Sequence, residues 1–477
     1  RATYSVMKTD LKKGSSRQVV SDTRFVVGAV HAPDGAMIAE HRYREVSRGN
    51  HEVSITKGKK VLFERQNLSF NPLTIWGLDS SGENLVLFID EGEPYGLHRM
   101  SLDDGTLTRI ELGHEGGTVA PVIDSRSLQV VGFELPGDKT IQIFEDPALK
   151  SQLEAIGAAM NGAAVTIESW TDDRSQSVIA VEHIGQPIDY YLFEPDVGAL
   201  SPVGNKAPHL DARPLGQIEG ISYHARDGLL IHGYLTLPPG KARSDGPFPL
   251  ILLPHGGPEA NDTLGFDWWA QAYAAAGYVV IQPNFRGSMG YGTGFRDAGY
   301  GEFGDKMVTD ILDAAVWADD EGVAVSGNAC IVGASYGGYA ALMAPLHDEA
   351  AVRCVVAVNP LTNPFKFLSD YGYQSFLVNS VERFLGVSRF DSAESRQSIT
   401  PTSRVNEFKV PVLLISGDQD STVPFEQSQD LANAARGVAD VTLLTLEGED
   451  HYLQSTQARF DILSNSLDFL NAHLSTD

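Results

Sequence analysis

One serine lies in a sequence pattern that is typical of an activated nucleophile. The stretch Gly333-Ala334-Ser335-Tyr336-Gly337 has the form G-x-S-x-G, directly after an apolar run and directly before a helical pattern. Such a serine occupies a sharp strand-to-helix turn, where small neighbours keep side chains away from the adjacent backbone. The pattern therefore predicts Ser335 as a nucleophile. A chance match in a chain with 47 glycines is the alternative, and it leaves the flanking strand and helix unexplained.

A serine hydroxyl is a weak nucleophile at neutral pH and needs a histidine base that a carboxylate orients. In this setting the expected chain order is serine, then aspartate or glutamate, then histidine. Asp420 follows the apolar run Val412–Ile415, and His451 follows the next run, Val441–Leu444. His473 belongs to a helical pattern and is expected at the surface. The sequence thus predicts a serine, aspartate and histidine triad.

The loop that carries the acid leaves two questions open. Asp418 competes with Asp420 for the acid role, and spacing alone does not decide between them. Asp418-x-Asp420-x-Thr422 is also a pattern that supplies an aspartyl nucleophile and a magnesium site in phosphoryl-transfer hydrolases. That rival leaves Ser335 and His451 without a role. The chain has no H-E-x-x-H motif and no Cys/His cluster of metal spacing, so the sequence implies no cofactor.

Acyl transfer also needs N–H donors for the oxyanion, usually the residue after the nucleophile and a loop after an earlier strand. The first donor would be the backbone N–H of Tyr336. The second would come from His255-Gly256-Gly257-Pro258, which follows the apolar run Pro249–Leu253. Its glycines allow the backbone to approach a substrate closely. A simple Gly-Pro turn is the alternative reading of this stretch.

These loops must meet at one edge of a sheet. From residue 205 onward, apolar runs alternate with helical patterns, which predicts a doubly wound, mostly parallel sheet buried on both faces. A hairpin-like pair at 220–224 and 229–237 comes first. Parallel strands are predicted at 249–253, 278–281, 329–332, 355–358, 412–415 and 441–444. Helices are predicted at 268–276, 308–319, 338–345, 427–436 and 458–474.

The first 204 residues have a different texture, which predicts a separate all-β, propeller-like domain (1–204) before the α/β domain (205–477). Turn motifs at 33–35, 80–82, 124–126 and 172–174 each precede an apolar strand and recur about every 45 residues. This period fits propeller blades, of which about four are visible. The single helical pattern, at 147–160, is interpreted as an insertion at the domain interface.

The motifs together resemble the prolyl oligopeptidase family of serine peptidases, most closely its acylaminoacyl-peptidase branch. The resemblance covers the whole second domain, and it rests on 255–258, 284–288, 333–339, 417–424 and 447–451. The family couples an α/β hydrolase to a β-propeller that restricts entry to short or unstructured peptides. It usually has seven or eight blades, so we expect that the propeller is incomplete or unusual.

The resemblance assigns the site. It implies that Ser335, Asp420 and His451 form the triad, and that the backbone N–H groups of Tyr336 and Gly257 bind the oxyanion. The predicted function is hydrolysis of peptide amide bonds through an acyl-enzyme. Three alternatives remain: an isopeptidase acting on lasso peptides, which the family includes, a broad esterase, and a catalytically silent propeller-based binding protein.

Five aromatic residues follow the predicted strand at 355–358. They could line an apolar pocket for the acyl side of a substrate, and packing in the core is at least as good an explanation for any one of them. They are Phe365, Phe367, Tyr371, Tyr373 and Phe376.

Charge and composition narrow the partners. The formal net charge of −26 repels nucleic-acid phosphates and anionic membrane surfaces, and no apolar run reaches the roughly 18 residues of a membrane span. We therefore expect no nucleic acid and no membrane as partners. The resemblance implies a peptide substrate, and the oligomeric state is open. Cys330 and Cys354 lie in apolar runs, which favours two buried thiols over a mutual disulfide, and a cytoplasmic over a periplasmic location. Because the chain begins with Arg1, removal of a leader or of an N-terminal segment is also expected.

Overall fold

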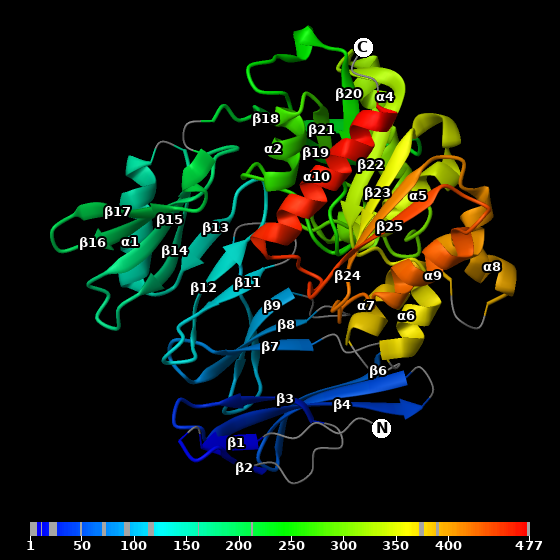
Figure 1. Ribbon diagram of the computed structural model, residues 1–477. Coiled ribbons are helices and arrows are strands. Elements are labelled where there is room, and N and C mark those ends of the chain that lie inside the picture. The colour runs from blue at the N-terminus through cyan, green and yellow to red at the C-terminus, as the bar shows by residue number, and fades with distance from the viewer. Residues whose placement is uncertain are drawn as a thin grey trace.

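The chain has two regions of different architecture, as the computed structural model shows (Figure 1). The structure describes all residues except 1–6, 11, 19–25, 48–49, 69–72, 90–95, 113–118, 161, 211–212, 372–375, 388–390 and 475–477. An all-β region (the β region, residues 7–205) precedes an α/β region (residues 218–473). The expected fold class is therefore confirmed, whereas a domain boundary at residue 204 stays a prediction.

The described part of the β region forms five antiparallel sheets that follow one another along the chain. The first is the hairpin of β1 (Met7–Asp10) and β2 (Ser15–Gln18). The second contains β3 (Val26–His31), β4 (Met37–Ser47), β5 (Asn50–Lys57) and β6 (Lys60–Leu68). The third contains β7 (Leu73–Leu78), β8 (Asn84–Ile89), β9 (Gly96–Ser101) and β10 (Leu107–Arg109). The fourth contains β11 (Ala120–Ile123), β12 (Val130–Leu135) and β13 (Ile141–Phe144), and the fifth β14 (Ala164–Trp170), β15 (Ser177–Glu182), β16 (Asp189–Glu194) and β17 (Ala199–Asn205).

Each of the four predicted turns joins the first two strands of one sheet. An aspartate caps each turn by accepting a hydrogen bond of 2.8–3.1 Å from a backbone N–H two or three residues further on. These aspartates are Asp34, Asp79, Asp124 and Asp173. Asp side chains stabilise turns in this way because they satisfy N–H groups that no strand pairs. One unit of the sequence repeat therefore corresponds to one sheet with its capped turn.

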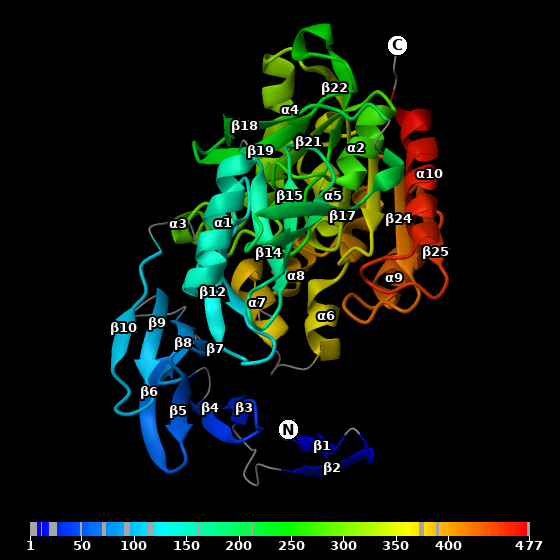
Figure 2. The same cartoon turned by 90° about the vertical axis from the view of Figure 1, so that its left-hand side faces the viewer.

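In the described part of the β region a single helix, α1 (Pro147–Ala159), accompanies the strands, close to the predicted range (Figure 2). Asp146 caps its N-terminus by accepting from the N–H groups of Ala148 and Leu149. Leu149 and Ile156 are buried against Val165 and neighbouring strand residues of the fifth sheet. The apolar side of α1 thus packs within the β region.

The α/β region is built on one eight-stranded sheet, with the order β18-β19-β21-β20-β22-β23-β24-β25. The strands are β18 (Ile218–His224), β19 (Leu230–Thr236), β20 (Phe248–Leu252), β21 (Val279–Asn284), β22 (Ala324–Ala334), β23 (Cys354–Val358), β24 (Val412–Gly417) and β25 (Val441–Leu446). The first two form the predicted antiparallel hairpin, and the six strands β20 to β25 are parallel to one another. The carboxyl ends of the parallel strands therefore lie at one edge, where the predicted site loops begin.

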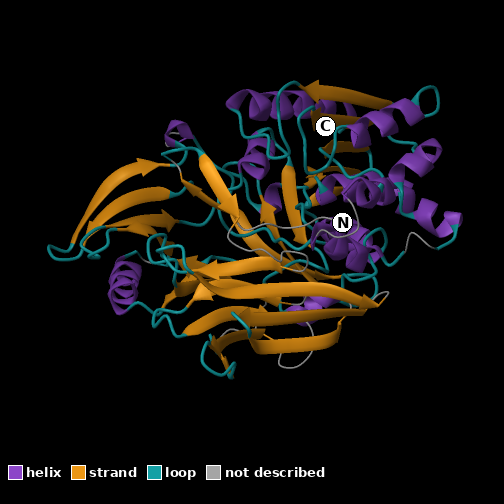
Figure 3. Ribbon diagram, turned by 90° about the horizontal axis from the view of Figure 1, so that it is seen from below, coloured by secondary structure: helices purple, strands orange, loops and turns teal. Residues whose placement is uncertain are grey.

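Helices cover both faces of this sheet (Figure 3). One face packs against α4 (Lys306–Asp320), α5 (Tyr336–His347) and α9 (Glu426–Ala435), and the other against α2 (Trp268–Ala275) and α10 (Thr456–His473). The remaining helices are α3 (Thr293–Asp297), α6 (Pro364–Tyr371), α7 (Phe376–Leu385) and α8 (Ala393–Ser398). Double coverage explains why β20 and β23 are apolar at every position. None of the helices in the described residues is long and apolar enough to cross a bilayer.

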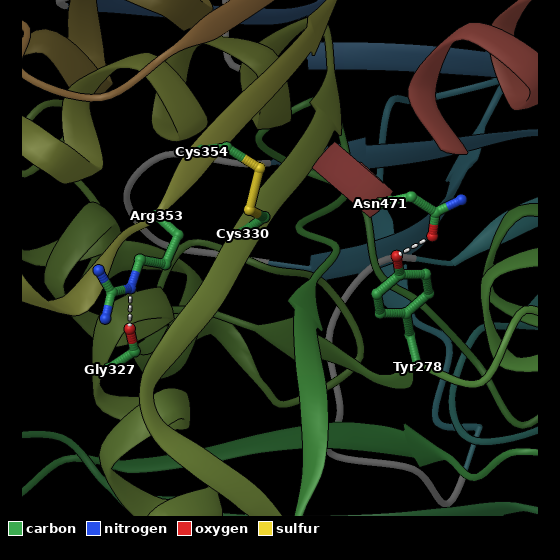
Figure 4. Close-up of a disulfide and its surroundings, with 6 residues drawn as sticks. All are labelled: Tyr278, Gly327, Cys330, Arg353, Cys354 and Asn471. Atoms are coloured by element: carbon green, nitrogen blue, oxygen red, sulfur yellow. Dashed lines mark hydrogen bonds between the residues drawn. A yellow bond between two sulfur atoms is a disulfide. The ribbon is translucent and has the colours of Figure 1, made fainter. Parts of the chain in front are cut away.

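The two cysteines form a disulfide, so the expectation of two unpaired thiols is wrong (Figure 4). Both residues are fully buried, as expected. They also lie opposite each other on the neighbouring strands β22 and β23, with a Cα–Cα distance of 4.8 Å. Parallel register points both side chains to the same face of the sheet, where the sulfur atoms meet. The cytoplasmic location was expected because two free thiols were expected. It loses this support and stays a prediction.

The two regions meet at residues 264–266, in the loop that precedes α2. The N–H of Leu264 donates to the carbonyl of Asp138 at 3.0 Å, and the N–H of Gly185 donates to the carbonyl of Leu264 at 2.9 Å. The carboxylate of Asp138 also accepts from the hydroxyl of Tyr234 on β19 at 2.5 Å. Glu182 accepts from the N–H of Phe266 at 3.3 Å. Two loops of the β region thus hold a segment of the α/β region between them.

Candidate active site

Ser335 occupies the sharp turn between β22 and α5, where the G-x-S-x-G pattern predicts it. Its backbone angles, φ 56° and ψ −117°, lie in a region that residues other than glycine rarely adopt and that persists only where the surroundings enforce it. Its N–H donates to the carbonyl of Val358 on β23 at 2.9 Å, and its carbonyl accepts from the N–H of Tyr339 at 3.0 Å. The turn places Ser335 at the carboxyl end of β22.

Glycines make this turn possible because no side chain fits around it. A Cβ atom on Gly333 would lie 2.5 Å from the carbonyl carbon of Gly337, and one on Gly337 would lie 2.2 Å from the carbonyl oxygen of Pro254. A Cβ atom on Gly338 would lie 3.0 Å from Pro360. The requirement for small residues inferred from the pattern thus has a direct steric cause.

His451 and Asp420 form a hydrogen-bonded pair in loops that follow the neighbouring strands β25 and β24. His451 Nδ1 lies 2.7 Å from Asp420 Oδ2, and the side chains are 13% and 1% exposed. A carboxylate only accepts hydrogen bonds, so Nδ1 carries the proton and Nε2 of the neutral ring is left as an acceptor. Asp420 Oδ1 accepts from the N–H groups of Thr422 and Val423, both at 2.8 Å. These bonds fix the carboxylate and, through it, the orientation of the imidazole.

Asp418 has a different set of partners. Its Oδ1 accepts from the N–H of Gly448 at 2.7 Å, which links the loop after β24 to the loop after β25. The geometry therefore joins Asp420, and not Asp418, to the histidine. Among the described residues no three His, Cys, Asp or Glu side chains gather closely enough to hold a metal ion.

The loop at residues 255–258 lies directly against the serine. A Cβ atom on Gly256 would be 3.4 Å from Ser335 Cβ and 4.0 Å from its Oγ. Gly257 adopts φ 119° and is exposed. Tyr336 is the first residue of α5, so its N–H has no acceptor within the helix. Both predicted oxyanion donors thus belong to segments that adjoin Ser335, and their role remains a proposal.

His255 supports this loop, a role that the sequence analysis did not assign. Its Nδ1 lies 2.7 Å from the carbonyl of Gly256 and its Nε2 lies 2.9 Å from Ser288 Oγ. Its ring stacks on Phe285, with centroids 4.4 Å apart. Burial lowers the pKa of His255 to about 4, so the ring is neutral at pH 7. Both residues stand in motifs that the sequence analysis identified, at 255–258 and 284–288, but the sequence did not indicate that His255 and Ser288 are in contact.

Arg286 anchors the segment that contains Ser288. Its Nε and Nη2 donate to Asp310 on α4 at 2.8 and 2.7 Å, and its Nη1 and Nη2 donate to Asp227 at 2.8 and 2.9 Å. Asp310 is fully buried and Asp227 is 37% exposed. Burial raises the pKa of Asp310 while Arg286 opposes the rise, and hydrogen bonds from Arg286 lower the pKa of Asp227 to about 2. The guanidinium thus joins α4 and the β18–β19 turn to the site.

The five aromatic residues after β23 divide into two groups. Phe367 is buried in the core, and Phe365 is partly buried against the same core. These two positions therefore follow the core-packing alternative. The pocket expectation for Tyr371, Tyr373 and Phe376 lies outside the described side chains.

Comparisons with known proteins point to one family. Residues 264–477 match the sequence profile of the prolyl oligopeptidase family. Dipeptidyl aminopeptidase BIII of Pseudoxanthomonas mexicana is 28% identical over 467 residues, which cover 94% of this chain and 66% of that protein. The human acylamino-acid-releasing enzyme is 23% identical over 415 residues, which cover 85% of this chain and 50% of that protein. The chain thus spans less than two thirds of the length of these curated relatives.

A solved structure agrees with the fold. The puromycin-hydrolyzing peptidase of Mycobacterium tuberculosis superposes with a TM-score of 0.73 at 19% identity, covering 97% of this chain and 72% of that one. The sheet order and the strand–serine–helix turn define the second region as an α/β hydrolase. With the match over residues 264–477, that region is a domain of the prolyl oligopeptidase family, as the motifs led us to expect.

Proposed function

We propose that the protein is a serine peptidase that cleaves amide bonds of short peptides through an acyl-enzyme on Ser335. The observation that carries the proposal is the 2.7 Å contact between His451 Nδ1 and Asp420 Oδ2. The two residues lie in the loops after β25 and β24, at the same edge of the sheet as Ser335 after β22. An oriented imidazole and a serine in a strained turn are the components that nucleophilic acyl transfer needs. The names of the relatives, a dipeptidyl aminopeptidase and an acylamino-acid-releasing enzyme, support the same class.

The proposed reaction has two halves. His451 Nε2 takes the hydroxyl proton of Ser335 while Oγ bonds to the substrate carbonyl carbon, and the carbonyl π electrons move to oxygen. The backbone N–H groups of Tyr336 and Gly257 stabilise that oxyanion. As the oxyanion collapses, the C–N bond breaks and the histidine gives its proton to the leaving amine. Water then repeats the sequence at the ester and releases the acid and free serine.

The first test is covalent labelling of the native chain by a fluorophosphonate, read by intact mass. We expect one adduct, and none in Ser335→Ala. Circular dichroism of Ser335→Ala confirms that the variant is folded. An unlabelled native chain would refute the proposal and favour a binding protein that does not turn over.

The second test assigns the substrate class. The native enzyme is given peptides with a free N-terminus, N-acetylated peptides of the same sequence, isopeptide-linked threaded peptides, and matched ester and amide pairs. We expect turnover of free or acylated short peptides, since the relatives are named for these activities. Turnover of the isopeptide alone would make the protein an isopeptidase, and turnover of esters without amides would make it an esterase. Control of access by the β region is proposed on the same basis and is tested with substrates of increasing length.

A further inference from the structure

The loop after β23 contains a buried amide side chain that contacts the strand before Asp420 and the loop of His451. Asn359 is 2% exposed. Its Oδ1 accepts from the N–H of Gly417 at 2.9 Å, and its Nδ2 donates to the carbonyl of His451 at 3.2 Å and to that of Asp450 at 3.4 Å. One side chain therefore binds the last residue of the acid strand and the backbone of the histidine itself.

The backbone at this position is equally constrained. The N–H of Asn359 donates to the carbonyl of Ile415 on β24 at 2.9 Å, and the preceding carbonyl, of Val358, accepts from the N–H of Ser335. Asn359 adopts φ 42°, a conformation that asparagine tolerates better than most residues but that still costs free energy. The segment 358–359 is thus bonded to the turn of Ser335, to the strand that precedes Asp420 and to the loop of His451.

We propose that Asn359 is a positioning residue for the hydrolytic reaction: its side chain holds the His451 backbone against the acid strand and so sets the place of the imidazole relative to Ser335. This inference rests on the proposed function. Bonds such as those from Gly448 to Asp418 and from Gln419 to the carbonyl of Glu449 join the two loops to each other. Asn359 joins them to the strand beside the nucleophile.

An amide is the group that this place requires. The side chain faces one N–H donor and two carbonyl acceptors, and an asparagine offers one acceptor and two donors in a fixed plane. A carboxylate would accept from Gly417 but would repel the two carbonyls. Glycine would relieve the positive φ while removing all three side-chain bonds, so Asn359→Gly separates the loss of positioning from added backbone strain.

The test compares Asn359→Gly with a matched control. Gln427 is also a buried amide, 1% exposed, and its side chain binds Thr362 and Asn363 in the same loop without contacting the triad. We expect Asn359→Gly to lower kcat about 10- to 100-fold with KM within about twofold, because misplacement of a catalytic group by about 1 Å costs up to about 100-fold. Fluorophosphonate labelling should slow by the same factor. Gln427→Ala should lower the unfolding midpoint with kcat within about threefold.

A spectroscopic readout separates this inference from the proposed function. The His451 N–H bonded to Asp420 should give a downfield proton resonance in the native chain, assigned by its loss in His451→Ala. We expect that resonance to broaden or move upfield in Asn359→Gly and to persist in Gln427→Ala, whether or not the protein turns over a substrate. An unchanged resonance together with an unchanged labelling rate in Asn359→Gly would overturn the inference, as would equal losses in both variants.

If Asn359→Gly does not fold, Asn359→Asp tests the same point by pH. The protonated carboxyl matches the amide in shape and donates one hydrogen bond, whereas the ionised form donates none. The labelling rate of Asn359→Asp relative to the native chain should therefore fall as pH rises. A ratio that is constant or rises with pH would contradict the role of Asn359 as a donor to the His451 carbonyl.

Discussion

Replacement of Asp310 by asparagine should destabilise the protein far more than the same replacement of Asp227, although both carboxylates bind Arg286. The Arg286 side chain is 5% exposed, and Asp310 is fully buried, whereas Asp227 is 37% exposed. Loss of one partner from a buried ion pair costs about 3–5 kcal/mol because the remaining charge stays desolvated. Loss of an exposed partner costs about 0–1 kcal/mol because water replaces it. Asparagine keeps the shape of each side chain, so the comparison isolates charge and burial.

The assay is urea unfolding and thermal melting of the two variants and the native chain at pH 7, with the slope of each urea transition checked for constancy. At about 2 °C per kcal/mol for a domain of this size, thermal midpoints should fall by about 6 °C or more for Asp310→Asn and by less than about 2 °C for Asp227→Asn. Because Arg286 anchors the segment of Ser288 and His255, the labelling rate should fall in the first variant only. Equal destabilisation by both variants would refute the assignment of the stability to the buried carboxylate.

Three further predictions follow from the site and the sheet. Asp420→Asn should slow fluorophosphonate labelling by about 10³- to 10⁴-fold without a matching loss of stability, and Asp418→Asn should slow it far less; similar losses would contradict the acid assignment. The pKa of His255 is near 4 in the folded protein against about 6.5 unfolded, so the unfolded chain binds more protons between these values. The free energy of unfolding should therefore fall by up to about 3 kcal/mol as pH drops from 6.5 to 4, and urea midpoints should show a shallower pH slope in His255→Gln. Replacing Cys330 and Cys354 by alanine should cost about 3 kcal/mol, since the disulfide closes a loop of 24 residues; detection of two free thiols in the denatured, unreduced native chain would refute the bond itself.

The parallel strands were predictable because burial on both faces leaves runs that are apolar at every position. The runs at 355–358 and 412–415 correspond to β23 and β24 nearly residue for residue. The last strand is different: three of the six side chains of β25 are only half-buried and two are exposed, because β25 lies at the edge of the sheet. Which strand lies at the edge depends on the strand order, and a local sequence pattern does not contain the strand order.

Contacts between distant segments could not be predicted from the sequence, because they too depend on the arrangement of the strands and not on a local pattern. The burial of each cysteine could be inferred from its neighbours, but their pairing depends on the register of β22 against β23. Spacing likewise left Asp418 and Asp420 equivalent, and only the approach of the loop after β25 distinguishes them. Asn359 carried no recognisable signal because its partners, at residues 417, 450 and 451, are backbone groups that any sequence would supply.

The bonds that join Leu264 to two loops of the β region limit how the two regions can move relative to each other. The loop from residue 257 to residue 266 is fastened at alternate positions: Ala260 and Asp262 bond to Met289 and Asn284 of the α/β region, and Leu264 and Phe266 bond to the β region. A displacement of the β region would therefore act, through the bonds at Leu264 and Phe266, on a short segment that begins at Gly257 beside the serine. Any displacement of one region against the other must therefore either break the bonds at Leu264 or move the segment that contains Gly257, one of the two proposed oxyanion donors.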